Sequence, residues 1–181
     1  ASRRLAEGPG CCHNEGMSRP YELEPIGDMP DAPRGVIVRD AAEEAIEAAA
    51  TDLFFHAMNC VRAFGDFNMA LSGGRTPVRL YQTLMLDPQF RAFPWKRTHL
   101  WVVSEHEAAP EERSANGLLR ELIATHSDIP REQFHPIDVP GGAEAYAARL
   151  RETLGWREPG HDRLDYVLLG LGTDGSTAGL Q

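Results

Sequence analysis

The sequence predicts an α/β domain with a doubly wound, mostly parallel sheet that has helices on both faces. Two observations support this fold class. Short apolar runs alternate with stretches of helical periodicity from about residue 35 onward, and polar or glycine-rich turns follow three of these runs. Strands that alternate with helices at this spacing are typical of a mostly parallel sheet that is covered on both sides.

The first predicted helix begins near Asp40 and ends at Gly65. Asp40 precedes an alanine-rich stretch with Glu43 three residues later, which is a pattern similar to a capping box. Apolar side chains then recur at steps of three and four residues and predict one buried helix face. These side chains are Ile46, Ala49, Ala50, Leu53, Phe54, Ala57, Met58 and Val61.

A strand, a tight turn and a second helix are predicted next. Residues 67–71 form an apolar run that leads directly into the turn Ser-Gly-Gly-Arg-Thr-Pro at 72–77. Thr76 is a good N-cap and Pro77 suits the first helical position, so we expect the helix to begin there.

The later elements complete the alternation. Residues 98–103 and 164–169 read as strands, and residues 117–125 and 143–154 read as amphipathic helices. Residues 134–137 predict a short extended piece, which proline excludes from a central position in the sheet. The last strand has apolar residues on both faces, as a buried parallel strand does.

Composition limits the classes of partner. The chain has 181 residues, a formal net charge of −9 and an isoelectric point near 5.2, so a nucleic acid is a poor candidate partner. No apolar run reaches the length of a membrane span, which predicts a soluble protein. Cys11, Cys12 and Cys60 make no disulfide framework or metal-binding spacing, which favours a reducing compartment, either the cytoplasm or the matrix of a mitochondrion or plastid.

The chemically marked residues follow the strands. The Ser72–Gly73–Gly74 turn, the Ser104–Glu105–His106 triplet and the glycine-rich loop at 170–177 each come directly after an apolar run. Ligands of parallel α/β sheets gather at the carboxyl ends of the strands, so we expect these segments to form one site. Glycines at 73 and 74 let backbone amides approach an anion, and the helix that follows directs its positive end toward it. A tight turn without a ligand would show the same local pattern.

The last loop allows a second interpretation. Gly170, Gly172 and Gly175 match the dinucleotide fingerprint in outline after an apolar strand. That fingerprint needs a following helix, a further strand and an acidic residue about 20 positions on, and the chain ends at Gln181. We therefore expect a glycine-rich turn that serves the same ligand as the Ser72 turn, and no nicotinamide cofactor.

In combination, these segments resemble the 6-phosphogluconolactonase family, which is related to the glucosamine-6-phosphate isomerases. The resemblance rests on three motifs in the family's order: residues 70–77, residues 95–101 with the acidic triplet and polar loop that follow, and residues 165–175. It implies a Rossmann-like α/β fold and hydrolysis of 6-phosphogluconolactone without a metal or organic cofactor, with a general base that helps water attack the carbonyl. It also implies that Ser72, Gly73, Gly74, Arg75, Thr76, Gly172, Gly175 and Thr177 hold the phosphorylated sugar or lactone.

The chain departs from the family where the chemistry is expected. Ser104–Glu105–His106 replaces the usual Asp-Glu-Arg, and Ser176 stands where the family has the histidine that is the expected base. A serine hydroxyl is no base near neutral pH, and loss of a positioned base costs about 10²–10⁴-fold in rate. Asp174, Glu105 and His106 are the remaining candidates for catalytic roles.

Two readings of the function follow. The sequence favours a catalytically weakened or inactive member that keeps a phosphosugar pocket and acts as a binding or assembly module. The alternative is an active lactonase with a rearranged site. We expect an irregular tail at 1–33 and an α/β domain at 34–181 that is incomplete at its carboxyl end, where further chain or a protein partner covers the last strand.

Overall fold

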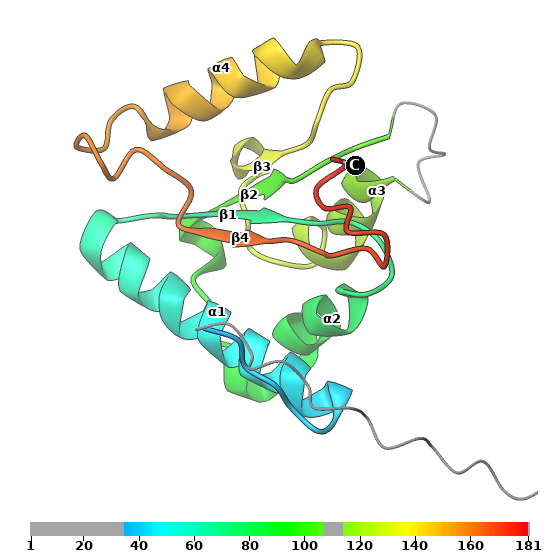
Figure 1. Cartoon of the computed structure of the whole chain (residues 1–181). Coiled ribbons are helices and arrows are strands. Elements are labelled where there is room, and N and C mark those ends of the chain that lie inside the picture. The colour runs from blue at the N-terminus through cyan, green and yellow to red at the C-terminus, as the bar shows by residue number, and fades with distance from the viewer. Residues whose placement is uncertain (1–34, 107–113, 181) are drawn as a thin grey trace, which may run out of the picture. The chain divides into compact units, whose positions relative to one another are not determined.

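The computed structural model describes residues 35–106 and 114–180, and one compact unit runs from Val38 to Gln181 (Figure 1). The predicted tail at 1–33 lies outside the described residues, so the domain boundary stays a prediction. Within the described residues, no helix is both long and apolar enough to cross a membrane.

The elements, in chain order, are α1 (Ala42–Phe64), β1 (Phe67–Leu71), α2 (Val78–Leu86), η1 (Pro88–Phe90), η2 (Trp95–Arg97), β2 (Thr98–Val102), α3 (Ala115–Leu119), η4 (Arg120–Ala124), η5 (Arg131–Gln133), β3 (Phe134–His135), α4 (Gly142–Leu154) and β4 (Tyr166–Leu168).

Four parallel strands form one sheet in the order β3-β2-β1-β4. In the register, Met69 of β1 lies opposite Leu100 of β2 on one side and Tyr166 of β4 on the other. The parallel α/β fold predicted from the sequence is therefore confirmed. Because all four strands run the same way, the segments that follow β1, β2 and β4 meet at one edge of the sheet.

The main apolar core lies between the sheet and the helices α1, α2 and α3 (Figure 1). Phe67, Met69 and Leu71 alternate along β1 and are fully buried against this layer. The predicted apolar face of α1 supplies Ala50, Leu53 and Ala57, which have no exposed surface. The helix ends at Gly65 as predicted, with φ of 89° and a hydrogen bond from its amide to the Val61 carbonyl.

Helix α4 covers the opposite face of the sheet (Figure 1). Its Tyr146 hydroxyl lies 2.9 Å from both the amide nitrogen and the carbonyl oxygen of Val102, and its ring packs edge-on against Trp101 of β2. Burial raises the pKa of Tyr146 to about 12, so this hydroxyl keeps its proton. The two-sided cover expected from the sequence is thus present, with α4 held by a polar anchor.

The starts of two helices differ from the sequence prediction. The N-cap of α1 is Ala41, with no capping bond from a side chain, so the predicted role of Asp40 is wrong. The N-cap of α2 is Pro77, again without a side-chain bond, so Thr76 is not its cap. In both cases the helix begins one residue later than predicted: the Ala41 carbonyl accepts from Ala45 and the Pro77 carbonyl accepts from Tyr81.

The predicted helix over 117–125 has two kinds of backbone geometry. An α-helical part, α3, is capped by Ser114, whose side chain accepts from the Gly117 amide at 2.8 Å. Residues Arg120–Ala124 then continue as the π-helical turn η4. Strand β3 has two residues and lies at the edge of the sheet, as proline at 136 led us to expect.

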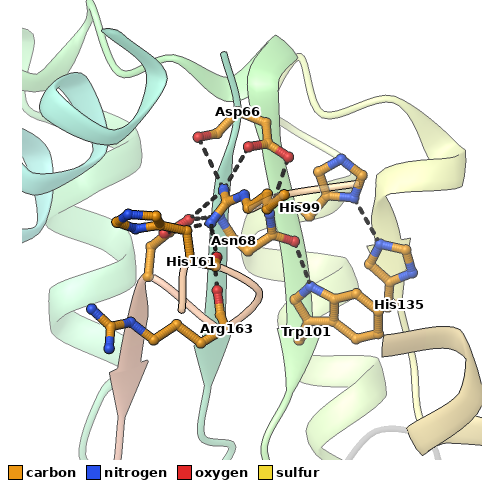
Figure 2. Close-up of polar contacts among 9 residues, drawn as sticks. Asp66, Asn68, His99, Trp101, His135, His161 and Arg163 are labelled. Atoms are coloured by element: carbon orange, nitrogen blue, oxygen red, sulfur yellow. Dashed lines mark hydrogen bonds and ion pairs between the residues drawn. The ribbon is translucent and has the colours of Figure 1, made fainter. Parts of the chain in front are cut away.

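A buried polar network lies at the amino ends of the strands (Figure 2). Arg157 donates to Asp66, which precedes β1, and to Asp165, which precedes β4. Asp66 accepts from the Asn68 amide group, and Asn68 accepts from the Trp101 indole at 3.1 Å. Burial would lower the pKa of Arg157, but the two carboxylates outweigh it and raise the pKa, so the guanidinium stays charged.

Strand β4 is the outer strand on the side opposite β3. Val167 keeps 45% of its surface exposed and the following Leu169 keeps 50%. The sequence predicts a strand buried on both faces, and within the described residues this burial is incomplete; β4 also pairs with β1 alone, so its outer edge is open there.

Candidate functional site

A pocket of about 430 Å³ opens at the carboxyl ends of β1, β2 and β4. Its walls come from three segments, 72–74, 104–106 and 176–179, together with Ala115 and Gly170. These are the three chemically marked turns of the sequence, and the fold brings them together as the parallel sheet predicts.

The predicted site residues divide into two groups. Those that line the pocket are Ser72, Gly73, Gly74, Glu105, His106 and Thr177. Those that lie outside its lining are Arg75, Thr76, Gly172, Asp174 and Gly175. Thr76 faces a neighbouring apolar groove of about 260 Å³, which shares Ser72, Gly73 and Gly170 with the pocket.

The Ser-Gly-Gly turn is fixed by hydrogen bonds and by close packing. The Ser72 hydroxyl donates to the Leu168 carbonyl at 2.8 Å, which ties the end of β1 to the end of β4. The Tyr81 hydroxyl of α2 donates to the Ser72 carbonyl at 2.6 Å, and burial raises the pKa of Tyr81. A Cβ on Gly73 would lie 2.5 Å from the Ala115 Cβ, so only glycine fits at this position.

The acidic triplet presents one engaged carboxylate and one exposed imidazole. The Glu105 carboxylate accepts from the backbone amides of His106, Ala115 and Asn116. His106 lines the pocket and is exposed to solvent. The imidazole of His106 is therefore the ring of this wall that a ligand in the pocket can reach.

The glycine-rich loop folds onto itself. Asp174 accepts from both the hydroxyl and the amide of Ser176, at 2.6 and 3.0 Å. These two hydrogen bonds lower the pKa of the exposed Asp174 carboxyl, and the bond from the Ser176 hydroxyl has the larger effect. Thr177 donates to the Gly170 carbonyl at 2.8 Å, and Gly175 has φ of 85°, a conformation that favours glycine. Ser176 itself lines the pocket at the place where the resemblance expects a histidine.

Three residues of the pocket lining were not assigned to the site by the sequence analysis. Ala115 comes from the start of α3, and Ala178 and Gly179 come from the end of the last loop. Their small side chains carry no chemical signal of their own. Ser114, a strong N-cap residue, marks the start of α3 in the sequence and is the signal that could have located Ala115.

Metal ligation finds little support in this part of the chain. Within residues 35–106 and 114–180, no group of three or more histidine, cysteine or carboxylate side chains is placed to hold a metal ion. The absence of a cofactor stays a prediction from the sequence.

The comparison with family models decides the family. Residues 40–180 match the model described as glucosamine-6-phosphate isomerases/6-phosphogluconolactonase. The chain belongs to this family. The match includes all four strands and all three walls of the pocket.

Individual relatives agree with the family model. The chain is 36% identical over 151 residues to the human GDH/6PGL endoplasmic bifunctional protein, a match that covers 77% of this chain and 18% of the human protein. It is 32% identical over 114 residues to the 6-phosphogluconolactonase of Haemophilus influenzae, covering 62% of this chain and 49% of that enzyme. The match thus spans about half of that lactonase and a smaller part of the bifunctional protein.

Solved structures share the fold. The 6-phosphogluconolactonase of Trypanosoma cruzi superposes with a TM-score of 0.65 at 24% identity, over 78% of this chain and 60% of that one. The enzyme of Thermotoga maritima superposes with a TM-score of 0.60 at 23% identity, over 75% and 59%. At these identities the likeness establishes the Rossmann-like architecture of the 6-phosphogluconolactonase family and nothing finer.

Proposed function

We propose that this chain is a 6-phosphogluconolactonase-like domain that binds a phosphorylated sugar or lactone and has lost most of its catalytic power. The observation that carries the proposal is the pocket itself. It keeps the Ser72–Gly74 turn of the family, whereas Ser104, His106 and Ser176 stand in its walls at the positions where the family has acidic, guanidinium and imidazole groups. Binding surface is kept and proton-transfer groups are replaced.

The remaining polar groups support weakened chemistry. A general base needs a lone pair directed at the attacking water. Glu105 accepts three backbone hydrogen bonds, and Asp174 lies outside the pocket lining and accepts from Ser176. Ser176 donates its hydroxyl proton to that carboxylate and has no basicity near neutral pH.

One observation favours the alternative function, an active lactonase of the pentose phosphate pathway with a rearranged site. His106 lines the pocket and is open to solvent, so its imidazole is available as a base. In this reading a His106→Ala variant loses the activity of the unmodified chain, and the same loss contradicts the proposal of an inactive module.

Hydrolysis of freshly prepared 6-phosphogluconolactone, followed against its spontaneous decay, tests the proposal. We expect a rate near background for the unmodified chain, and a rate at least about 10²-fold higher after Ser104→Asp, His106→Arg and Ser176→His are combined. The matched control is Glu152→Ala, a change at an exposed position of α4. Full activity of the unmodified chain that disappears with Asp174→Ala would overturn the proposal.

A protein partner over the β4 edge is the second part of the proposal. Val167 and Leu169 are about half exposed, and Leu171 in the next loop is 81% exposed. An uncovered apolar edge strand favours association. We expect Val167→Lys with Leu169→Lys to weaken assembly, measured by sedimentation velocity with the natural partners in cell extract. Leu86→Lys, on exposed α2 surface, is the control, and equal assembly of both variants would remove β4 from the interface.

The compartment is the third part. Cys60 is buried, and burial together with nearby Asp165 raises its pKa to about 11, so it remains a thiol that is poorly reactive. A reducing compartment, cytoplasm or organelle matrix, is the compartment we propose from the cysteine pattern. The name of the human relative includes the word endoplasmic and supports a different compartment. Fractionation of cells that produce the tagged chain distinguishes the two.

A further inference from the structure

Within the described residues, the Glu105 carboxylate accepts hydrogen bonds from three backbone amides of its own chain. Oε1 accepts from the amides of His106 at 2.9 Å and Ala115 at 3.2 Å, and Oε2 accepts from the amide of Asn116 at 2.8 Å. Hydrogen bonds from amides to an ionised carboxylate are among the stronger ones in proteins. These bonds join the end of β2 to the first residues of α3.

We infer that Glu105 is a positioning residue that sets the shape of the phosphosugar pocket, and that it is no general base. The inference deepens the proposed function and rests on it for the identity of the ligand. Proton uptake by Glu105 would place a hydroxyl donor opposite an amide donor and would break one of the three bonds. A base that must break such a bond at every turnover is poorly suited to the task.

The carboxylate controls the pocket through Ala115. Gly73 and Ala115 both line the pocket, and a Cβ on Gly73 would lie 2.9 Å from the Ala115 Cα. The start of α3 thus packs so closely against the Ser-Gly-Gly turn that a side chain at position 73 would collide with Ala115. If the Glu105 bonds to Ala115 and Asn116 are lost, this wall is free to move away from the turn.

Asn116 extends the same support to the sheet edge. Its side chain donates to the Ile137 carbonyl at 2.8 Å and accepts from the Ile137 amide at 2.9 Å. Glu105 therefore connects β2, α3 and the segment after β3 through one residue. The amides of Ala115 and Asn116 already donate to Glu105, so an anionic ligand must take its amide donors from other walls, where Gly73 and Gly74 of the turn, and also Gly170 and Gly179, offer glycine backbone.

Amide hydrogen exchange of the purified full chain tests the inference without any ligand. We expect Glu105→Ala to raise the exchange rates of the Ala115 and Asn116 amides by about 10–100-fold, which corresponds to the loss of charge-assisted bonds. Glu105→Gln keeps one side-chain oxygen acceptor and is expected to show an intermediate increase. Glu152→Ala, at an exposed position of α4, is the control and leaves these rates unchanged.

A titration with 6-phosphogluconate, the stable hydrolysis product, adds the readout of the pocket. We expect Glu105→Ala to weaken binding by about 10-fold or more, seen in the Gly73 and Gly74 amide resonances, with Glu105→Gln between the two. If neither the unmodified chain nor any variant binds 6-phosphogluconate, the proposed function fails. The amide exchange rates alone then decide the role of Glu105.

Steady-state kinetics provide a further test of the positioning role. In the chain that carries Ser104→Asp, His106→Arg and Ser176→His, a positioning role predicts that Glu105→Gln raises KM more than it lowers kcat and leaves the acid limb of the pH profile in place. Unchanged amide exchange in Glu105→Ala overturns the inference, and so does a Glu105→Gln variant that loses kcat and the acid limb with KM unchanged.

Discussion

Arg157 and Asp165 form a two-pronged ion pair, with 2.8 Å between Nη1 and Oδ1 and 2.9 Å between Nη2 and Oδ2. The Arg157 side chain keeps 1% of its surface exposed and the Asp165 side chain 6%. The same guanidinium also donates to Asp66, and its Cζ atom lies 4.9 Å from the centre of the Phe64 ring. One side chain thus fixes the starts of β1 and β4, which lie far apart in the sequence.

Arg157→Ala is expected to lower the free energy of unfolding by about 3–5 kcal/mol, because it leaves two carboxylates without their buried partner. Urea denaturation followed by circular dichroism measures the change. Arg151→Ala, at an exposed position in the last turn of α4, is the control and is expected to change stability by less than about 0.5 kcal/mol. Equal stabilities of the two variants would contradict a role for the ion pair in stability.

Gly73→Ala tests the close approach of the Ser-Gly-Gly turn to α3. The new Cβ would lie 2.5 Å from the Ala115 Cβ, so we expect a loss of about 1–3 kcal/mol in unfolding free energy and weaker binding of 6-phosphogluconate. Gly170→Ala is the control in the same pocket, because a Cβ there meets no atom within 4 Å. Partial rescue of Gly73→Ala by Ala115→Gly would identify the contact as the cause.

Stability is expected to fall at acid pH because of His135. Its ring is buried and stacked on Trp101 at 3.7 Å, and burial, with smaller effects of His99 and Arg149, lowers its pKa from 6.5 to about 4. The unfolded chain therefore takes up a proton below pH 6.5 while the folded chain does not, so the free energy of unfolding decreases from pH 6.5 to about 4 and is level above. The decrease has an upper limit of about 3 kcal/mol.

Denaturant titrations at several pH values check the contribution of His135. A His135→Gln variant is expected to show a shallower decrease between pH 6.5 and 4 than the unmodified chain. His126→Gln, an exposed residue after η4, serves as the control and keeps the full slope. A slope that is the same in all three proteins would assign the acid sensitivity to other groups.

Two tyrosine hydroxyls, of the buried Tyr81 and the half-buried Tyr146, are expected to separate stability from binding. Tyr146→Phe removes the hydroxyl that anchors α4 at Val102 and is expected to cost about 1–3 kcal/mol in unfolding free energy with little change in ligand affinity. Tyr81→Phe removes the donor to the Ser72 carbonyl and is expected to weaken 6-phosphogluconate binding as well. Equal effects of both variants on affinity would contradict the assignment of Ser72 to the pocket wall.

The sequence predicts the sheet well because the relevant signals are local. The apolar run at Phe67–Leu71 is the observed β1, and Gly65 ends α1 where its left-handed conformation requires glycine. Helix starts were predicted less well. Asp40 and Thr76 have the right side chains for capping, but a cap forms only if the backbone enters the helix at that residue.

The site was predicted to the level of segments and not of side chains. Parallel strand ends meet at one edge whatever their side chains are, so the three turns had to come together. The directions of side chains within a turn depend on contacts that are distant in sequence. Asp174 turns toward Ser176 and outside the pocket lining, and Glu105 reaches Ala115 and Asn116, which no local pattern in the sequence indicates.

The parallel arrangement separates two kinds of residue along the length of the strands. The ion pairs of Arg157 with Asp66 and Asp165 lie where β1 and β4 begin, and Ser104, His106 and Ser176 lie at the other edge, around the pocket. Replacement of reactive groups at the pocket therefore leaves the buried ion pairs intact. Substitutions of the polar side chains around the pocket can therefore change turnover without touching the ion pairs that hold the starts of β1 and β4, so turnover and fold stability can vary independently.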